Sequence, residues 1–135
     1  VLAALDIARL VEDARAAAER AGRPQWRTRV GVHTGPVMAG VIGTRKFAYD
    51  IWGDAVNLAA RMQSAGEPGR VNVSAETFRR VEPFFVCEPR GKIEAKGKGA
   101  VDMYFVRGLR PELSEAGAGV VPNARFREQY GRLGG

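Results

Sequence analysis

The stretch Tyr49-Asp50-Ile51-Trp52-Gly53-Asp54-Ala55-Val56-Asn57-Leu58-Ala59-Ala60-Arg61-Met62 decides the fold of this chain. It predicts a short extended segment that turns directly into a helix. Gly53 allows the turn. Asp54 is expected to be the N-cap, because its carboxylate can accept a backbone N–H of the first helical turn.

The spacing of residues divides this helix into two faces. One face is small and mostly apolar, is expected to pack closely, and carries Val56, Ala59, Ala60 and Gln63. The other face is polar and carries Asp54, Asn57, Arg61 and Ser64. Residues three and four positions apart are neighbours on a helix, so the Asn57 amide and the Arg61 guanidinium lie one turn apart. Taken alone, such a row is typical of a solvated surface, and the rest of the chain has to decide.

Length and composition narrow the class of protein. The 135 residues suffice for one domain with a core, and 45% are hydrophobic, as is usual for a globular protein. A net charge of +6 suits an anionic ligand such as a nucleotide, or a nucleic acid. No basic run with interleaved aromatic residues is present, which leaves nucleic-acid binding as the weaker alternative. No membrane-spanning run and no signal peptide are visible. Cys87 is the single cysteine, so an intramolecular disulfide is impossible and a reduced intracellular compartment fits.

The chain before this stretch reads as a helix and two strands. Residues 1–21 predict an amphipathic helix whose packing stripe is Ile7, Leu10, Val11, Ala14, Ala17 and Ala18. Residues 27–33 alternate as a strand does, which makes His33 a packed strand residue rather than a metal ligand. The glycine-rich residues 34–43 fit either a phosphate-binding loop or a second strand. The strand is favoured, because no Gly-Lys-Ser/Thr follows.

The chain after this stretch predicts a strand at 70–74, a helix from Ser74 to about Val81, and two more strands. Those two strands, 84–95 and 101–107, are joined by the turn Lys96-Gly97-Lys98-Gly99. The alternation of strands and helices predicts an α/β (α+β) class, with helices on one side of a sheet. Residues 110–122 are rich in Pro, Gly and Ala and predict a linker. Residues 123–135 predict a short amphipathic tail.

Several motifs, taken in order, resemble the class III adenylate/guanylate cyclase catalytic domain. They are Arg29-Val30-Gly31-Val32-His33-Thr34-Gly35-Pro36-Val37, Ala39-Gly40-Val41-Ile42-Gly43, Tyr49-Asp50-Ile51-Trp52-Gly53-Asp54, Val56-Asn57-Leu58-Ala59, Arg61-Met62, Val73-Ser74, Arg90-Gly91, Lys96-Gly97-Lys98-Gly99 and Tyr104-Phe105. Each motif is weak alone, whereas the ordered set is specific. The resemblance implies a ferredoxin-like fold, incomplete at its N-terminus, with residues 1–109 as the C-terminal portion of the catalytic domain.

The resemblance also assigns roles to four residues. Arg61 matches the arginine that meets the α-phosphate in the transition state, and Asn57 matches the asparagine that orients the ribose. Lys96 matches the lysine that neutralises the triphosphate, and Asp50 matches the residue that reads the purine edge. A carboxylate accepts a hydrogen bond from the adenine amino group and repels the guanine carbonyl, so Asp50 favours ATP.

The sequence departs from the family where metal is bound. Family members hold two Mg²⁺ or Mn²⁺ ions through two aspartates that precede the first helix seen here, and neither motif is present. Asp6-Ile7 is only a superficial echo, because it lies within a helix and lacks the flanking Gly-Phe. The family's purine-contacting lysine is also missing. We therefore assign no metal ligand within this chain, expect the aspartates upstream of it, and expect the chain alone to be inactive.

The function expected from the resemblance is part of an adenylate cyclase, which converts ATP to 3′,5′-cyclic AMP and pyrophosphate for intracellular signalling. The nucleotide is expected between two catalytic domains, normally of a homodimer, without nucleic acid. The expected location is the cytoplasm, either free or as the cytoplasmic domain of a larger or membrane-tethered protein. Two alternatives remain open: a non-catalytic, cyclase-like dimerisation or regulatory module, and a guanylate cyclase.

Overall fold

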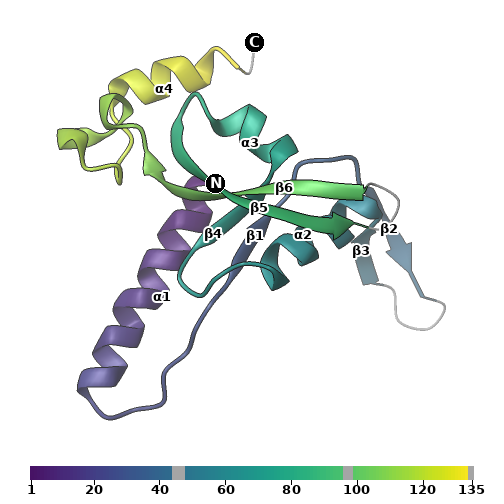
Figure 1. Ribbon diagram of the computed structural model, residues 1–135, viewed down its shortest axis with the longest axis horizontal. Helices are drawn as coiled ribbons and strands as arrows, with labels where there is room; N and C mark the ends of the chain where they lie inside the picture. The colour runs from purple at the N-terminus through teal and green to yellow at the C-terminus, as the bar shows by residue number, and fades with distance from the viewer. Residues whose placement is uncertain (44–47, 96–98, 134–135) are drawn as a thin grey trace.

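The computed structural model describes residues 1–43, 48–95 and 99–133, and within them a four-stranded sheet forms the body of the molecule (Figure 1). In spatial order its strands are β1 (Val30–Val32), β4 (Val71–Ser74), β6 (Gly99–Leu109) and β5 (Phe85–Ala95). β1 runs parallel to β4, and the other neighbours are antiparallel. All four residues of β4 are buried, so this strand forms the centre of the sheet. The predicted α+β class is confirmed.

A separate hairpin of β2 (Met38–Ile42) and β3 (Ala48–Trp52) follows β1. Its two strands form a sheet of their own and stand away from the four-stranded sheet, at the right of Figure 1. The glycine-rich stretch is therefore a strand and not a phosphate-binding loop, as the missing Gly-Lys-Ser/Thr indicated. Within the hairpin, Gly40 lies opposite Asp50.

Helices cover both faces of the four-stranded sheet. They are α1 (Leu2–Arg20), α2 (Asp54–Ser64), α3 (Ala75–Val81) and α4 (Ala124–Gly131). Residues Val71 and Val73 of β4 belong to the larger core, with residues of α1, α3 and α4. Asn72 points to the other face, where it contacts Met62 of α2. The expectation of helices on one side only was wrong, because successive residues of a central strand bury side chains in opposite directions.

Helix α1 is amphipathic, but it packs through a different stripe from the predicted one. Its buried residues are Leu5 and Ala8, whereas Ile7 and Leu10 are exposed. The helix contacts β4 near its N-terminal end and then extends away from the sheet (Figure 1). Periodicity therefore predicted the helix correctly but its packing face wrongly. The buried residues of α1 lie only in its first turns, where the helix contacts the sheet.

The C-terminal segment, residues 110–133, folds back onto the body. It contains two short 3-10 turns, Pro111–Leu113 and Glu115–Gly117, and a β-bridge between Ser114 and Pro122. Leu113 and Ser114 are buried, and Leu109 N–H donates to the Gly119 carbonyl at 2.9 Å. The stretch predicted as a linker is thus ordered. The division of the chain into catalytic portion, linker and tail stays a prediction.

Helix α4 attaches the end of this segment to the larger core. Asn123 caps the helix, because its Oδ1 accepts the Phe126 backbone N–H at 3.0 Å. The Phe126 ring lies edge-on to the rings of Phe84 and Phe85. Among the described residues, no helix has the length and hydropathy needed to cross a bilayer.

Candidate active site

The N-cap of helix α2 lies one residue earlier than the sequence predicted. Gly53 is the N-cap, with φ 130° and ψ 175°, and its carbonyl accepts the Asn57 N–H at 3.2 Å. Asp54 is the first helical residue, so its predicted role as N-cap was wrong. Residues with a Cβ rarely adopt such a positive φ, which explains why glycine occupies the turn. Asp54 still places a negative charge in the first turn, where the helix dipole favours it.

The buried face of α2 also differs from the predicted one. Ala55, Leu58 and Met62 are buried, whereas Ala60 and Gln63, which were predicted to pack, are exposed. Leu58 and Met62 form a second, smaller core with Met103, because their larger side chains reach the sheet and bury more apolar area than alanines do. The polar face was predicted correctly in its exposure: Asn57 and Arg61 both lie in solvent.

Arg61 connects α2 to the end of β5. Its guanidinium Nη1 donates a hydrogen bond to the backbone carbonyl of Glu94 at 3.0 Å. Sequence reasoning missed this contact, because a backbone carbonyl leaves no signature in the sequence. Lys96, the predicted triphosphate-binding residue, follows two positions later and lies outside the described residues.

Asp50 lies on β3, and its side chain is exposed. Its Oδ1 accepts the backbone N–H of Ile51 at 2.8 Å. α2 contacts β3, and Figure 1 shows the hairpin, α2 and the joined ends of β5 and β6 at one end of the molecule. The structure therefore places Asn57 and Arg61 on one helix face and Asp50 on the neighbouring hairpin, at the same end of the molecule.

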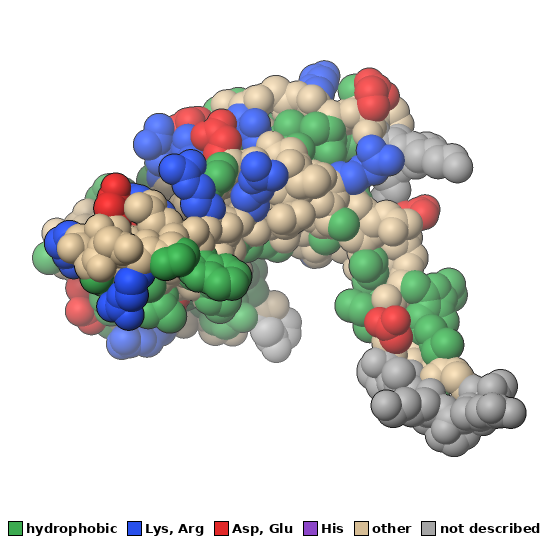
Figure 2. Space-filling view, turned by 90° about the horizontal axis from the view of Figure 1, so that it is seen from below, with side chains coloured by type: hydrophobic (Ala, Val, Ile, Leu, Met, Phe, Trp, Pro, Cys, Tyr) green, Lys and Arg blue, Asp and Glu red, His purple; other side chains and the backbone are tan. Residues whose placement is uncertain are grey.

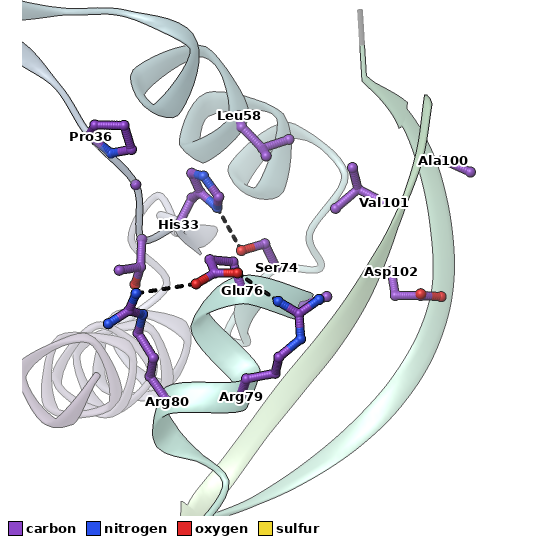
Figure 3. Close-up of a pocket in the computed structure, with 13 residues that line it drawn as sticks. His33, Pro36, Leu58, Ser74, Glu76, Arg79, Arg80, Ala100, Val101 and Asp102 are labelled. Atoms are coloured by element: carbon purple, nitrogen blue, oxygen red, sulfur yellow. Dashed lines mark hydrogen bonds and ion pairs between the residues drawn. The ribbon is translucent and has the colours of Figure 1, made fainter. Parts of the chain in front are cut away.

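A pocket of about 490 Å³ opens at the carboxyl ends of the parallel strands β1 and β4 (Figure 3). Its wall includes His33, whose Nδ1 lies 2.7 Å from Ser74 Oγ. His33 directly follows β1 and is only partly buried, so it is a residue of the pocket wall and not the packed strand residue that was predicted. Glu76 forms ion pairs with Arg79 and Arg80 at the same pocket. Among the described residues, Asp50, Asn57 and Arg61 do not line this pocket.

The acidic side chains near the predicted site have other partners, and the described residues show no larger cluster of metal ligands. Within ranges 1–43, 48–95 and 99–133, no three His, Cys, Asp or Glu side chains gather as metal ligands do. Asp50 already binds a backbone N–H of its own strand, and Glu94 faces Arg61 through its carbonyl. No chemical step is therefore derived through a metal held by this chain.

Comparison with known proteins decides the family. The model of the adenylate and guanylate cyclase catalytic domain matches residues 2–108. The chain belongs to this family. The predicted resemblance is confirmed, and with it the cyclase catalytic fold of the body.

Three cyclases illustrate the similarity. An adenylate cyclase of Mycobacterium tuberculosis is 49% identical over 82 residues, which make up 61% of this chain and 18% of that relative. The crystal structure of the adenylyl cyclase CyaB from P. aeruginosa has a TM-score of 0.65 and 31% identity, covering 73% of this chain and 52% of that chain. The catalytic core of a rhodopsin-guanylyl cyclase with converted specificity, in complex with ATPalphaS, has a TM-score of 0.58 and 35% identity, covering 73% and 56%. The chain thus spans under a fifth of the curated relative and about half of each solved cyclase.

Proposed function

We propose that this chain is the C-terminal portion of an adenylate cyclase catalytic domain, which converts ATP to 3′,5′-cyclic AMP and pyrophosphate. One observation carries the proposal. In a chain of the cyclase family, α2 presents Asn57 and Arg61 one turn apart on its exposed face, and Arg61 reaches the end of β5. The similar adenylate cyclases of M. tuberculosis and P. aeruginosa support ATP as the substrate class.

Arg61 and Asn57 act on different parts of the substrate, Arg61 on the α-phosphate and Asn57 on the ribose. The ribose 3′-hydroxyl attacks the α-phosphate, and negative charge develops on the phosphate oxygens as pyrophosphate leaves. A planar guanidinium that is always charged suits those oxygens, which is the role of Arg61. The Asn57 amide, with both donors and an acceptor, orients the ribose so that the 3′-hydroxyl lies in line for attack.

Asp50 and Lys96 bind the two ends of the nucleotide. The carboxylate of Asp50 is exposed on β3, so it is accessible to an adenine amino group. Its bond to the Ile51 N–H uses Oδ1, and the second oxygen, Oδ2, is the proposed acceptor. Lys96 is proposed to neutralise the triphosphate from the turn between β5 and β6. It follows Glu94 by two positions in the sequence, and the Glu94 carbonyl accepts the Arg61 bond, which supports a shared phosphate site beside Arg61.

A second catalytic domain completes the site in this proposal. The hairpin β2–β3 exposes Val41 and Ile51 on one face and Met38 on the other, because successive strand residues point to opposite sides. Figure 2 shows hydrophobic side chains along the arm that projects from the body of the molecule. Contiguous exposed apolar surface marks interaction sites. Two Mg²⁺ or Mn²⁺ ions, held by aspartates outside the described residues, would supply charge stabilisation at the reacting phosphate. Both the second domain and the metals are part of the proposal.

The decisive experiment assays the full-length protein with ATP and with GTP, in Mg²⁺ or Mn²⁺, and identifies the cyclic product by mass spectrometry. We expect cyclic AMP as the main product. Arg61→Ala is expected to lower kcat by about 10²–10³-fold with a smaller effect on KM, as for the loss of one charge-stabilising donor. Arg132→Ala, an exposed arginine on the far C-terminal segment, is the matched control and is expected to leave kcat within about twofold.

The same assay separates the rival functions. A near-normal kcat in Arg61→Ala would remove Arg61 from the mechanism. Equal kcat/KM for ATP and GTP, with no change in Asp50→Ala, would contradict the role of Asp50 in choosing adenine. A full-length protein that binds a second domain but makes no cyclic nucleotide would identify the regulatory module instead.

The isolated 135-residue chain is expected to make no cyclic nucleotide with either metal. Its described residues hold no cluster of metal ligands, and the reaction needs charge stabilisation at the leaving pyrophosphate. Metal-dependent turnover by the purified chain alone would contradict this expectation, because it would require metal ligands within these 135 residues.

A further inference from the structure

The last turn of α2 rests directly on the backbone of β1. A Cβ placed on Gly31 would lie 2.0 Å from the backbone nitrogen of Gln63 and 2.6 Å from the Met62 carbonyl carbon. No side chain fits at such distances, so Gly31 lets the helix approach more closely than any other residue would allow. Met62, at the centre of this contact, is fully buried. The position of α2 on the sheet is therefore set at its C-terminal end.

Asn72 of β4 contacts the same turn from the neighbouring strand. Its Nδ2 donates a hydrogen bond to the Met62 carbonyl at 2.8 Å and lies 3.5 Å from Met103 Sδ. The last carbonyls of a helix lack the usual partners four residues ahead. Here the Gly66 N–H bonds to the Gln63 carbonyl at 3.1 Å. Asn72 thus supplies a side-chain donor to a buried helix carbonyl.

Only one end of the Asn72 amide, the Nδ2 donor, has a hydrogen-bond partner among the described residues. Asn72 is fully buried, and within the part of the chain that the structure describes its Oδ1 has no hydrogen-bond partner. Its neighbours in β4 are Val71 and Val73, and burying a polar atom without a partner is unfavourable. What the amide adds is one directed bond to one atom of α2.

We propose that Asn72 is a positioning residue for Arg61, an inference that rests on the proposed function. Met62, whose carbonyl Asn72 holds, directly follows Arg61 in the sequence. The Arg61 guanidinium in turn reaches the Glu94 carbonyl at 3.0 Å. Asn72 and Gly31 together set the depth and rotation of the last turn of α2, and thereby where the guanidinium lies. Asn72 itself is fully buried and acts through the helix rather than on the substrate.

The test compares two buried residues of one strand in the full-length protein. Asn72→Leu removes the bond to α2, and Asn72→Ala does so without adding bulk if the leucine variant does not fold. Val73→Ala is the matched control, because Val73 is equally buried but belongs to the core on the opposite face. Urea denaturation measures the stability of each variant, and steady-state assays with ATP give kcat and KM.

Loss of the bond is expected to lower kcat at least tenfold with KM within about twofold, because a small misplacement of a transition-state group acts on rate rather than binding. Val73→Ala is expected to keep kcat within about twofold at a similar or larger loss of stability. In an Arg61→Ala background, Asn72→Leu is expected to lower kcat by less than about a further twofold. Both changes act through the Arg61 guanidinium, which this background already lacks.

Three outcomes would overturn the inference. Equal losses of kcat in the Asn72 and Val73 variants would make Asn72 merely structural and leave the proposed function standing. A full tenfold further loss in the Arg61→Ala background would show that Asn72 does not act through Arg61. A parent protein without cyclase activity would overturn the proposed function and the positioning role together.

Discussion

The hairpin β2–β3 and the C-terminal segment 110–133 differ in how their composition relates to their burial. An apolar segment is usually buried and a polar one exposed, but these two regions show the opposite. The hairpin is largely apolar, yet Met38, Val41 and Ile51 are 60%, 63% and 50% exposed. The C-terminal segment begins with residues 110–122, which are rich in Pro, Gly and Ala, yet Leu113 and Phe126 are only 2% and 6% exposed. Burial follows the position of a segment relative to the core. Composition shows only which side chains of a segment could be buried, and not whether a core lies beside them.

The difference has a physical reason in each region. The hairpin is a two-stranded sheet with no third strand beside it in the described part of the chain, so most of its described residues are exposed. The C-terminal segment follows β6 at the edge of the larger core, where a few large side chains reach into existing apolar space. We therefore interpret the first region as an interaction surface and the second as part of the folded body.

The largest effect is expected from Phe126→Ala in the 135-residue chain. Phe126 is buried against Phe84 and Phe85, so truncating it leaves a cavity and lowers the free energy of unfolding by about 3–5 kcal/mol. Urea denaturation measures this loss. Arg127→Ala, at an exposed position of the same helix, serves as the control and should cost far less. A loss below 1 kcal/mol for Phe126→Ala would mean that the segment is only loosely attached.

The next effect concerns the hairpin and appears in association rather than stability. Ile51→Asp in the full-length protein places a charge on the proposed interface and should weaken binding of a second catalytic domain about 30-fold or more. The free energy of unfolding of the 135-residue chain should change by less than about 0.5 kcal/mol, because Ile51 is half exposed there. Sedimentation velocity measures the association. Unchanged association would place the interface elsewhere.

A smaller effect is expected from Asn123→Ala. Asn123 Oδ1 caps α4 through the Phe126 N–H, and its Nδ2 donates to the carbonyls of Glu112 and Ser114. Loss of a cap costs about 1 kcal/mol, and the further bonds bring the expected loss to about 1–2 kcal/mol. Thermal denaturation of the 135-residue chain tests it, with Glu128→Ala as an exposed control on the same helix. A loss no larger than that of the control would show that the cap contributes nothing.

The smallest effect is a dependence of stability on pH above neutrality. Burial raises the pKa of the Cys87 thiol, which lies near Arg110 at the start of the C-terminal segment, from 9.0 to about 11. A raised pKa means that the folded state holds its proton longer, so stability is full below pH 9 and falls as pH rises toward 11. The loss by pH 9.5 should stay below about 1 kcal/mol, because that pH is well below the folded-state pKa and the thiol is only partly buried.

The variant Cys87→Ser tests this assignment. Denaturation curves at pH 8 and pH 9.5 should differ less for the serine variant than for the parent chain, since serine does not titrate in this range. An identical pH dependence in both proteins would assign the effect to another group.

Local patterns predicted much of the fold. The glycine-rich strand was correctly chosen over a phosphate loop, Ser74 caps α3 as expected, and the polar face of α2 is exposed. Faces of helices were predicted less well. On both α1 and α2 a regular apolar spacing indicated one stripe, whereas the sheet lies against another. Amphipathic spacing shows that a helix has a buried side, but the partner element decides which residues lie on it.

The sequence by itself determined the family, the order of the elements and the pairing of Asn57 with Arg61, because residues four apart on a helix share a face whatever surrounds them. Only the tertiary structure decided that Arg61 meets the Glu94 carbonyl, that Asn72 holds the Met62 carbonyl, and that the last turn of α2 rests on Gly31. Each of these contacts joins residues at least ten positions apart in the sequence. Packing of α2 against the sheet brings them together, and no local pattern in the chain encodes that geometry.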